Sequence, residues 1–232
     1  MKEYLILIIM SLLLFPITVL ANDKDTHINS GKEITRLIKE AKFDELKEKY
    51  GIETDKLQVA ANSIVKNDFN KLKLVVDQMS KEELQKTLKF NNTLLHITAR
   101  QNIKVAKKKA YKPELYPIVE YLIKKGIDIN AKNKGGKTPL ILFANRQTLT
   151  LPILEILINN GAEINAVDNY GDSALLTIIK TSSNKEFLEQ MSKYGADFNV
   201  ANNNGDTPLT LASKKGRTLA YIDLLKKAGA KK

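Results

Sequence analysis

A short motif that recurs at a nearly constant interval is the feature that most constrains how this 232-residue chain can fold. It reads Thr-Pro-Leu from Thr138 and again from Thr207, and related forms begin at Thr93 and Ser173. From Thr138 the motif recurs after 35 residues and then after a further 34. A period of this size is typical of stacked units, each of which buries its apolar face against its neighbours. The sequence therefore predicts a solenoid instead of one or two ordinary domains.

A second landmark follows the first in step. Gly126, Gly161 and Gly195 each begin a five-residue run that ends in Asn, and a shorter Gly-Ala copy stands at Gly229. Thr or Ser before a helix can accept a hydrogen bond from an unpaired backbone amide, and Pro suits the first helical position. Apolar runs such as 153–158 form one stripe of a second helix, which the glycine ends by adopting the left-handed conformation. Each unit is therefore predicted to be helix, turn, helix and a finger rich in Asn and Gly.

These residues resemble the ankyrin repeat, whose pattern of about 33 residues runs from a Thr-Pro-Leu-His helix start to a Gly-Ala ending. The resemblance implies an all-α ankyrin-repeat solenoid of helix-turn-helix units joined by short β-hairpin-like fingers. His96 retains the family's histidine, which the resemblance makes a structural residue that hydrogen-bonds neighbouring turns. A basic insertion falls at about 102–116, within the first repeat. The four repeats are predicted at about 91–132, 133–167, 168–201 and 202–232.

The segment 31–90 lacks both landmarks but keeps helical apolar spacing over 32–50 and 57–79. The outermost unit of a solenoid needs a polar outer face, and its sequence diverges for that reason. We therefore expect divergent N-terminal capping helical units here.

The first 21 residues are predicted to be a secretory signal peptide. Val19 and Ala21 supply the small residues before a cleavage site, which we expect after Ala21, and 22–30 is predicted to be a flexible leader. An uncleaved membrane anchor is the alternative, because 4–21 is only just long enough to span a bilayer and Pro16 interrupts it. Both predict an exported protein, periplasmic or secreted, with membrane contact only if the segment stays uncleaved.

Composition excludes several kinds of chemistry. The chain has no cysteine, so disulfides, thiolate metal sites and Cys nucleophiles are ruled out. His27 and His96 are its histidines, and neither has a second ligand at the spacing of a metal site. The run 134–138 ends like a phosphate-binding loop but lacks its first glycine. We predict no catalytic residues, metal, cofactor or small-molecule substrate, and no nucleic-acid partner despite a formal charge of +11.

The resemblance places partner contacts at the finger tips and at the concave ends of the first helices. Of the fifteen positions in that register, six are Lys or Arg and two are Asp. This indicates an acidic protein partner with Tyr170 as an aromatic anchor, although lysines that only solvate the groove would give the same pattern. The residues predicted to bind the partner are Lys134, Lys137, Arg146, Asn169, Tyr170, Lys180, Asn203, Asn204, Lys214 and Lys215.

The resulting functional prediction is a non-enzymatic, exported scaffold that binds a protein through its concave face and finger tips. Two alternatives stay open: a secreted effector directed at host proteins, and a membrane-anchored structural spacer. An enzyme hidden in the divergent region before residue 91 is a third class, disfavoured because its titratable residues do not converge.

Overall fold

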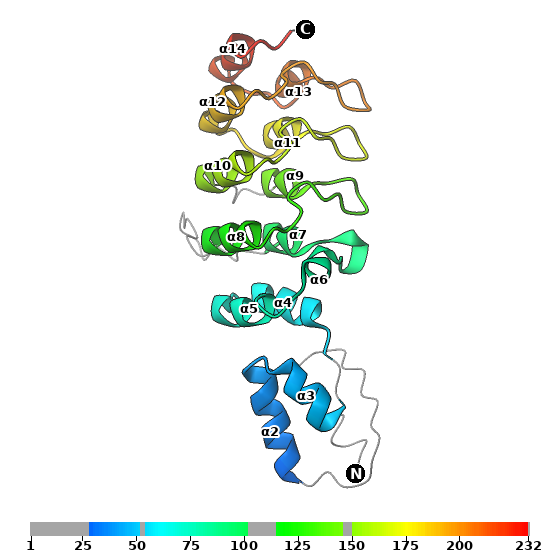
Figure 1. Cartoon of the computed structure of the whole chain (residues 1–232). Coiled ribbons are helices and arrows are strands. Elements are labelled where there is room, and N and C mark those ends of the chain that lie inside the picture. Colours follow the sequence, from blue (N-terminus) through cyan, green and yellow to red (C-terminus); the bar gives the residue numbers. More distant parts are fainter. Residues whose placement is uncertain (1–27, 52–53, 102–114, 146–149, 232) are drawn as a thin grey trace. The chain divides into compact units, whose positions relative to one another are not determined.

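The computed structural model describes residues 28–51, 54–101, 115–145 and 150–231 (Figure 1). The chain divides into two compact units, Met1–Lys86 and Thr87–Lys232. The predicted signal peptide, most of the predicted leader and 102–114 of the basic insertion lie outside the described residues, as does Arg146. No helix in the described ranges is both long and apolar enough to cross a membrane.

The N-terminal unit consists of short helices, and the two segments with predicted apolar spacing are both helical pairs. The first pair packs around Leu37, Ile38 and Leu46, and the second around Ile64 and Leu72, all of them buried. The first helix starts at residue 28, so it includes the last three residues of the predicted leader. The helices are α2 (Ile28–Lys39), α3 (Phe43–Tyr50), α4 (Lys56–Val65), α5 (Phe69–Val76) and α6 (Lys81–Gln85).

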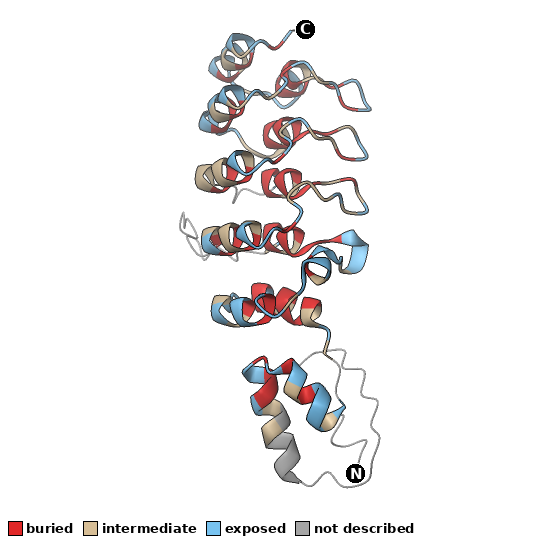
Figure 2. Cartoon of the chain, viewed as in Figure 1, coloured by how far each residue is buried: buried red, intermediate tan, exposed pale blue. Residues whose placement is uncertain are grey.

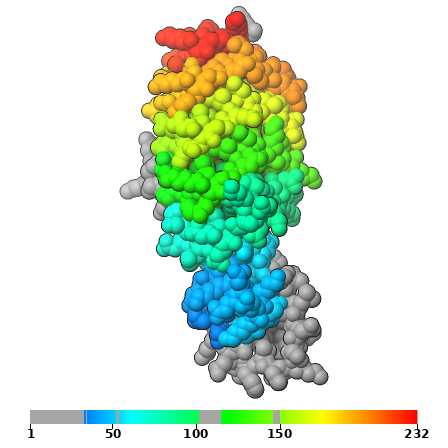
Figure 3. Space-filling model, viewed as in Figure 1, coloured from blue at the N-terminus to red at the C-terminus, as the bar shows by residue number. Residues whose placement is uncertain are grey.

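The C-terminal unit is a stack of four helix pairs (Figure 1). The first helices of the pairs are α7 (Leu94–Ala99), α9 (Pro139–Ala144), α11 (Ala174–Thr181) and α13 (Pro208–Lys214), and the second helices are α8 (Leu115–Lys124), α10 (Leu151–Asn159), α12 (Lys185–Lys193) and α14 (Leu219–Lys227). First helices pack on first helices to form one column, and second helices form the other. In the space-filling view the sequence colours follow one another in bands, so each pair lies against its neighbours in sequence (Figure 3). The predicted all-α repeat solenoid is confirmed.

The helices of the first column are more fully buried than those of the second. α7, α9 and α11 are almost entirely buried, and α13 exposes only its last turn, whereas the second helices bury one stripe and expose the other (Figure 2). Leu140 and Ile141 of α9, Leu175 and Leu176 of α11, and Leu211 of α13 are all less than 5% exposed. A residue replaced in this column would therefore disturb two neighbouring repeats.

The predicted helix starts are confirmed. In each case the Thr or Ser side chain accepts a hydrogen bond from the backbone amide three residues on, a cap worth about 1 kcal/mol. Pro139 and Pro208 occupy the first helical position, where no amide hydrogen is needed. The four capping residues are Thr93, Thr138, Ser173 and Thr207.

Asparagines after the second helices join one repeat to the next. The side-chain amide of Asn130 donates to the carbonyl oxygen of Gly161 at 2.9 Å, and its oxygen accepts from the amide of Glu163 at 2.9 Å. The same two bonds recur from Asn165 to Gly195 and Asp197, and from Asn199 to Gly229 and Lys231. The asparagine of the second landmark therefore fixes the spacing between successive repeats.

Candidate functional site

Four fingers precede the first helices: Leu88–Asn92, Asn133–Lys137, Asp168–Asp172 and Asn202–Asp206, called the first to fourth fingers. Each is closed by the same bond, in which the amide of its first residue donates to the carbonyl oxygen of its last. In Figure 1 the second to fourth fingers project from the column of first helices. The first finger contains the short 3-10 helix η1 (Lys89–Asn91) and belongs to the C-terminal unit, so this unit begins before the predicted repeat boundary at residue 91.

The later three fingers share an internal brace. The side-chain oxygen of Asn133 accepts hydrogen bonds from the amides of Gly135 and Lys137, at 2.9 and 3.1 Å. Asp168 and Asn202 make the same pair of bonds within the third and fourth fingers. A side chain that satisfies two amides of its own turn fixes the turn without help from other residues.

Backbone hydrogen bonds connect the fingers to one another. The amide of Lys134 donates to the carbonyl oxygen of Phe90 at 2.9 Å, and corresponding bonds join Asn169 to Gly135 and Asn203 to Tyr170. The side-chain amides of Asn169 and Asn203 also donate to carbonyl oxygens of the preceding finger. These two predicted contact residues therefore hold the row of fingers together.

Glycine is required where one finger passes close to the next. Gly171 has a φ of +74°, and a Cβ built there would lie 2.7 Å from Oδ1 of Asn203 and 2.9 Å from its backbone nitrogen. Gly136 makes a closer approach to Asn169. The dense packing at these points leaves the row of fingers little freedom to change its spacing.

Three of the predicted cations form ion pairs. Lys137 in the second finger pairs with the fully buried side chain of Asp168 in the third finger. Lys180 of α11 pairs with Asp172, and Lys214 of α13 pairs with Asp206, so each helix is tied to the finger before it. The surface therefore has less free positive charge than the sequence indicated, because aspartates of the fingers neutralise these lysines.

Lys134 and Lys215 are both exposed, and neither is paired with a carboxylate of the described ranges. Asn204 is exposed at the tip of the fourth finger. Arg146 was predicted to contact the partner but cannot be placed on this surface, since it lies outside the described residues. We call the fingers together with the last turns of α7, α9, α11 and α13 the finger face.

Two exposed aromatic side chains occupy the same position in their fingers. Tyr170 is 69% exposed at the third residue of the third finger, and Phe90 is 53% exposed at the third residue of the first. The sequence reasoning identified Tyr170 but missed Phe90, which fell before the predicted start of the repeats. Counting back three residues from the helix cap at Thr93, as from Ser173, would have found it.

A cleft of about 560 Å³ opens where the first and second fingers meet the ends of α7 and α9. Phe90, Arg100, Asn133 and Leu142 line it, and none of these four was predicted from the sequence as a contact residue. Arg100 is the cap residue at the end of α7 and is exposed. The full lining comprises Phe90, Arg100, Asn133, Lys134, Gly135, Lys137, Leu142 and Asn145.

His96 joins the first repeat to the second finger, in agreement with its predicted structural role. The backbone amide of Thr93 donates to Nδ1 of His96 at 3.2 Å, so Nε2 carries the hydrogen and donates to the carbonyl oxygen of Lys137 at 2.9 Å. Burial lowers the pKa of His96 below its usual value, because a charged imidazole would be poorly solvated there. Among the described residues, no three His, Asp or Glu side chains are grouped in a way that could hold a metal ion.

Comparison with protein families identifies the repeats. A family model described as ankyrin repeats (3 copies) matches residues 109–201 and, in a second overlapping match, residues 147–232. Together the matches span more than half of the chain. No curated protein matches it.

Proposed function

The chain belongs to the ankyrin-repeat family, and on that premise we propose that it is a non-enzymatic scaffold that binds a partner protein through its finger face. Ankyrin repeats are generally protein–protein interaction modules, and the family is generally non-catalytic. The observation that carries the proposal is the 69% exposure of Tyr170 at the tip of a finger that is hydrogen-bonded on both sides. A large exposed aromatic on a rigid support is typical of an interface anchor.

Rigidity supports the proposal in a second way. The braces of Asn133, Asp168 and Asn202 are already made in the free protein, so binding would order few additional groups. Preorganised surfaces bind more tightly because they lose less conformational entropy on association. Tip residues that take no part in these bonds are free to determine which partner is recognised.

We also propose that the partner surface is acidic. Lys134 and Lys215 extend from the finger face without a carboxylate partner in the described ranges, and Lys214 is 66% exposed although paired. Lys215→Glu is expected to weaken partner binding and to make it less sensitive to salt. Lys226→Glu on α14 is the matched control, because it changes the charge by the same amount outside the finger face.

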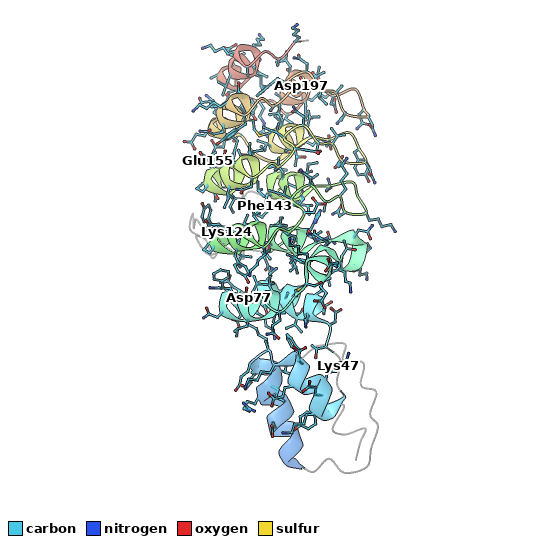
Figure 4. The ribbon with its side chains drawn as sticks, in the orientation of Figure 1. Lys47, Asp77, Lys124, Phe143, Glu155 and Asp197 are labelled. Carbon is cyan, nitrogen blue, oxygen red and sulfur yellow. The ribbon has the colours of Figure 1, made fainter. Side chains whose placement is uncertain are left out.

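Photo-crosslinking in the native cell tests directly whether the protein binds a partner. A photoreactive phenylalanine in place of Tyr170 should yield a discrete crosslinked protein, whereas the same group in place of Lys124 should not. Lys124 is 71% exposed on α8, in the column of second helices (Figure 4). Equal products from both positions, or none from Tyr170, would contradict the proposal.

Export is part of the proposal and rests on residues 1–21. Cell fractionation followed by N-terminal sequencing of the mature protein tests it. A new N-terminus at Asn22 supports cleavage, and an intact Met1 in the membrane fraction supports the anchored spacer. Mature protein confined to the cell envelope indicates a resident scaffold, and release into the medium indicates a secreted effector.

A further inference from the structure

The cleft beside the first finger combines apolar and cationic side chains. Phe90 and Leu142 supply apolar surface, and Arg100, Lys134 and Lys137 supply positive charge. Its volume of about 560 Å³ lies within the range of roughly 300–1,000 Å³ that is typical of ligand-binding clefts. It is therefore large enough to hold one or two side chains of another protein.

The charges in the cleft are not balanced. Lys137 is paired with Asp168, but Arg100 and Lys134 are exposed and make no ion pair with any carboxylate of the described ranges. The lining includes no acidic residue. A carboxylate brought into the cleft would therefore find two cations, one of them a guanidinium that can hold it through two parallel hydrogen bonds.

Phe90 has a backbone conformation that is unfavourable for a residue with a bulky side chain. Its φ and ψ of 65° and 29° lie in the left-handed region, which a bulky side chain rarely adopts. The ring is 53% exposed, so burial in the core does not offset this conformation. Its carbonyl oxygen is held by the amide of Lys134, which fixes the backbone at the edge of the cleft. Strained residues of this kind concentrate at binding sites.

From these observations we propose that the cleft binds a partner segment in which a bulky apolar side chain is flanked by carboxylates. The apolar side chain packs between Phe90 and Leu142, and the carboxylates bind Arg100 and Lys134. The inference rests on the proposed function, since it specifies which chemistry this part of the finger face recognises. Charge complementarity favours this occupant over a basic or purely apolar segment.

Fluorescence anisotropy with the full chain and labelled peptides tests the inference. The probe has the sequence Gly-Ser-Glu-Phe-Glu-Ser-Gly, and its two matched controls replace both glutamates by glutamine or the phenylalanine by alanine. We expect each control peptide to bind about tenfold more weakly than the probe, since each loses one of the two kinds of contact. Equal binding of all three peptides, or no binding of the probe at millimolar concentration, would overturn the inference.

Two variants then locate the site. Phe90→Gly removes the ring and relieves the left-handed strain, so it should bind the probe about tenfold more weakly while its melting temperature stays the same or rises. Arg100→Gln should weaken binding of the probe peptide but leave binding of the glutamine control peptide unchanged. Leu219→Ala, an 81% exposed residue on α14, and Lys226→Gln are the matched controls, and both should bind the probe within about twofold of the wild type.

The outcomes separate the inference from the proposed function. A crosslinked partner at Tyr170 combined with no effect of Phe90→Gly or Arg100→Gln on peptide binding would reject the cleft and retain the scaffold. Peptide binding that depends on both residues, with no crosslinked partner at Tyr170, would retain the cleft and contradict binding across the finger face.

Discussion

The first finger and the three later fingers form the same closed turn with different residue types. The later fingers begin with Asn or Asp, whose oxygen accepts two amides, and they place glycine at the position with positive φ. The first finger begins with Leu88, which has no such oxygen, and places Phe90 and Asn91 in the left-handed region. Its own brace is different: the side chain of Asn92 donates to the carbonyl oxygen of Lys89.

This difference indicates two roles within one row of fingers. The later fingers use their side chains to hold a fixed geometry, which suits a support for contact residues. In the first finger a bulky ring is exposed at a conformational cost of about 1 kcal/mol, which suits a residue kept for contact. Changes that remove the brace, the glycine or the strain should therefore have different effects in the two kinds of finger.

Removal of the brace in the third finger should have the largest effect. Asp168→Ala leaves Lys137 without its partner and two amides without an acceptor, so we expect the free energy of unfolding to fall by about 3 kcal/mol. Asp168→Asn keeps the acceptor found at Asn133 and Asn202 and loses only the ion pair, with an expected loss of about 1 kcal/mol. Urea denaturation measures both. Equal losses would show that the brace contributes little.

The glycine of the third finger gives the next largest effect, with a matched control in the fourth. Gly171→Ala combines left-handed strain with a clash against Asn203, and we expect a loss of about 2 kcal/mol. Gly205 has the same φ of +74°, but a Cβ built there meets nothing within 4 Å in the described structure, so Gly205→Ala should cost only about 1 kcal/mol. If both cost the same, the close approach between fingers is not rigid.

Features that depend on a residue and its immediate neighbours could be predicted from the sequence. The caps at Thr138 and Thr207 follow from a hydroxyl placed before a proline, and the structure places both as predicted. The left-handed conformation predicted for Gly126 and Gly161 is also confirmed. Each of these depends on chemistry within about four residues of the chain.

Features that depend on the spacing between repeats could not be predicted. The pairing of Lys137 with Asp168 joins two fingers, and the bond from Asn130 to Gly161 joins two repeats. Arg100 and Leu142 meet at one cleft only because α7 and α9 stack side by side. The same sequence pattern would allow other pairings if the rotation from one repeat to the next were different. Because ion pairs between repeats could not be predicted, the charge counted along the chain overstated the unpaired positive charge on the surface.

The junction between α7 and the second finger should be the part of the stack that is sensitive to acid. His96 makes this link, whereas Ile141, Leu176 and Thr210 occupy the same position in the later repeats. Its pKa is lowered on folding, mainly by burial, so the unfolded state binds the proton more readily. The stability that His96 contributes is therefore present above its usual pKa of 6.5 and is lost as the pH falls below it.

Urea denaturation at pH 7.5 and pH 5 measures this loss of stability, which should be smaller than the losses expected for Asp168→Ala and Gly171→Ala. His96→Gln is the control, because its side chain does not titrate in this range. Its stability should change less between the two pH values than that of the wild type. An equal change in both proteins would assign the acid sensitivity to other groups.

The smallest effect is expected from giving the first finger the glycine that the later fingers have. Asn91 has a φ of 57°, is exposed, and corresponds to Gly136, Gly171 and Gly205. Asn91→Gly should raise the free energy of unfolding by about 0.5 kcal/mol, because glycine adopts this conformation more readily than asparagine. Asn91→Ala should lower it by a similar amount, since alanine tolerates the left-handed region less well. Peptide binding at the cleft should not change in either variant, because Phe90 and Arg100 are untouched. If Asn91→Gly weakened binding of the probe peptide, the binding site would include the strained turn itself as well as the ring of Phe90.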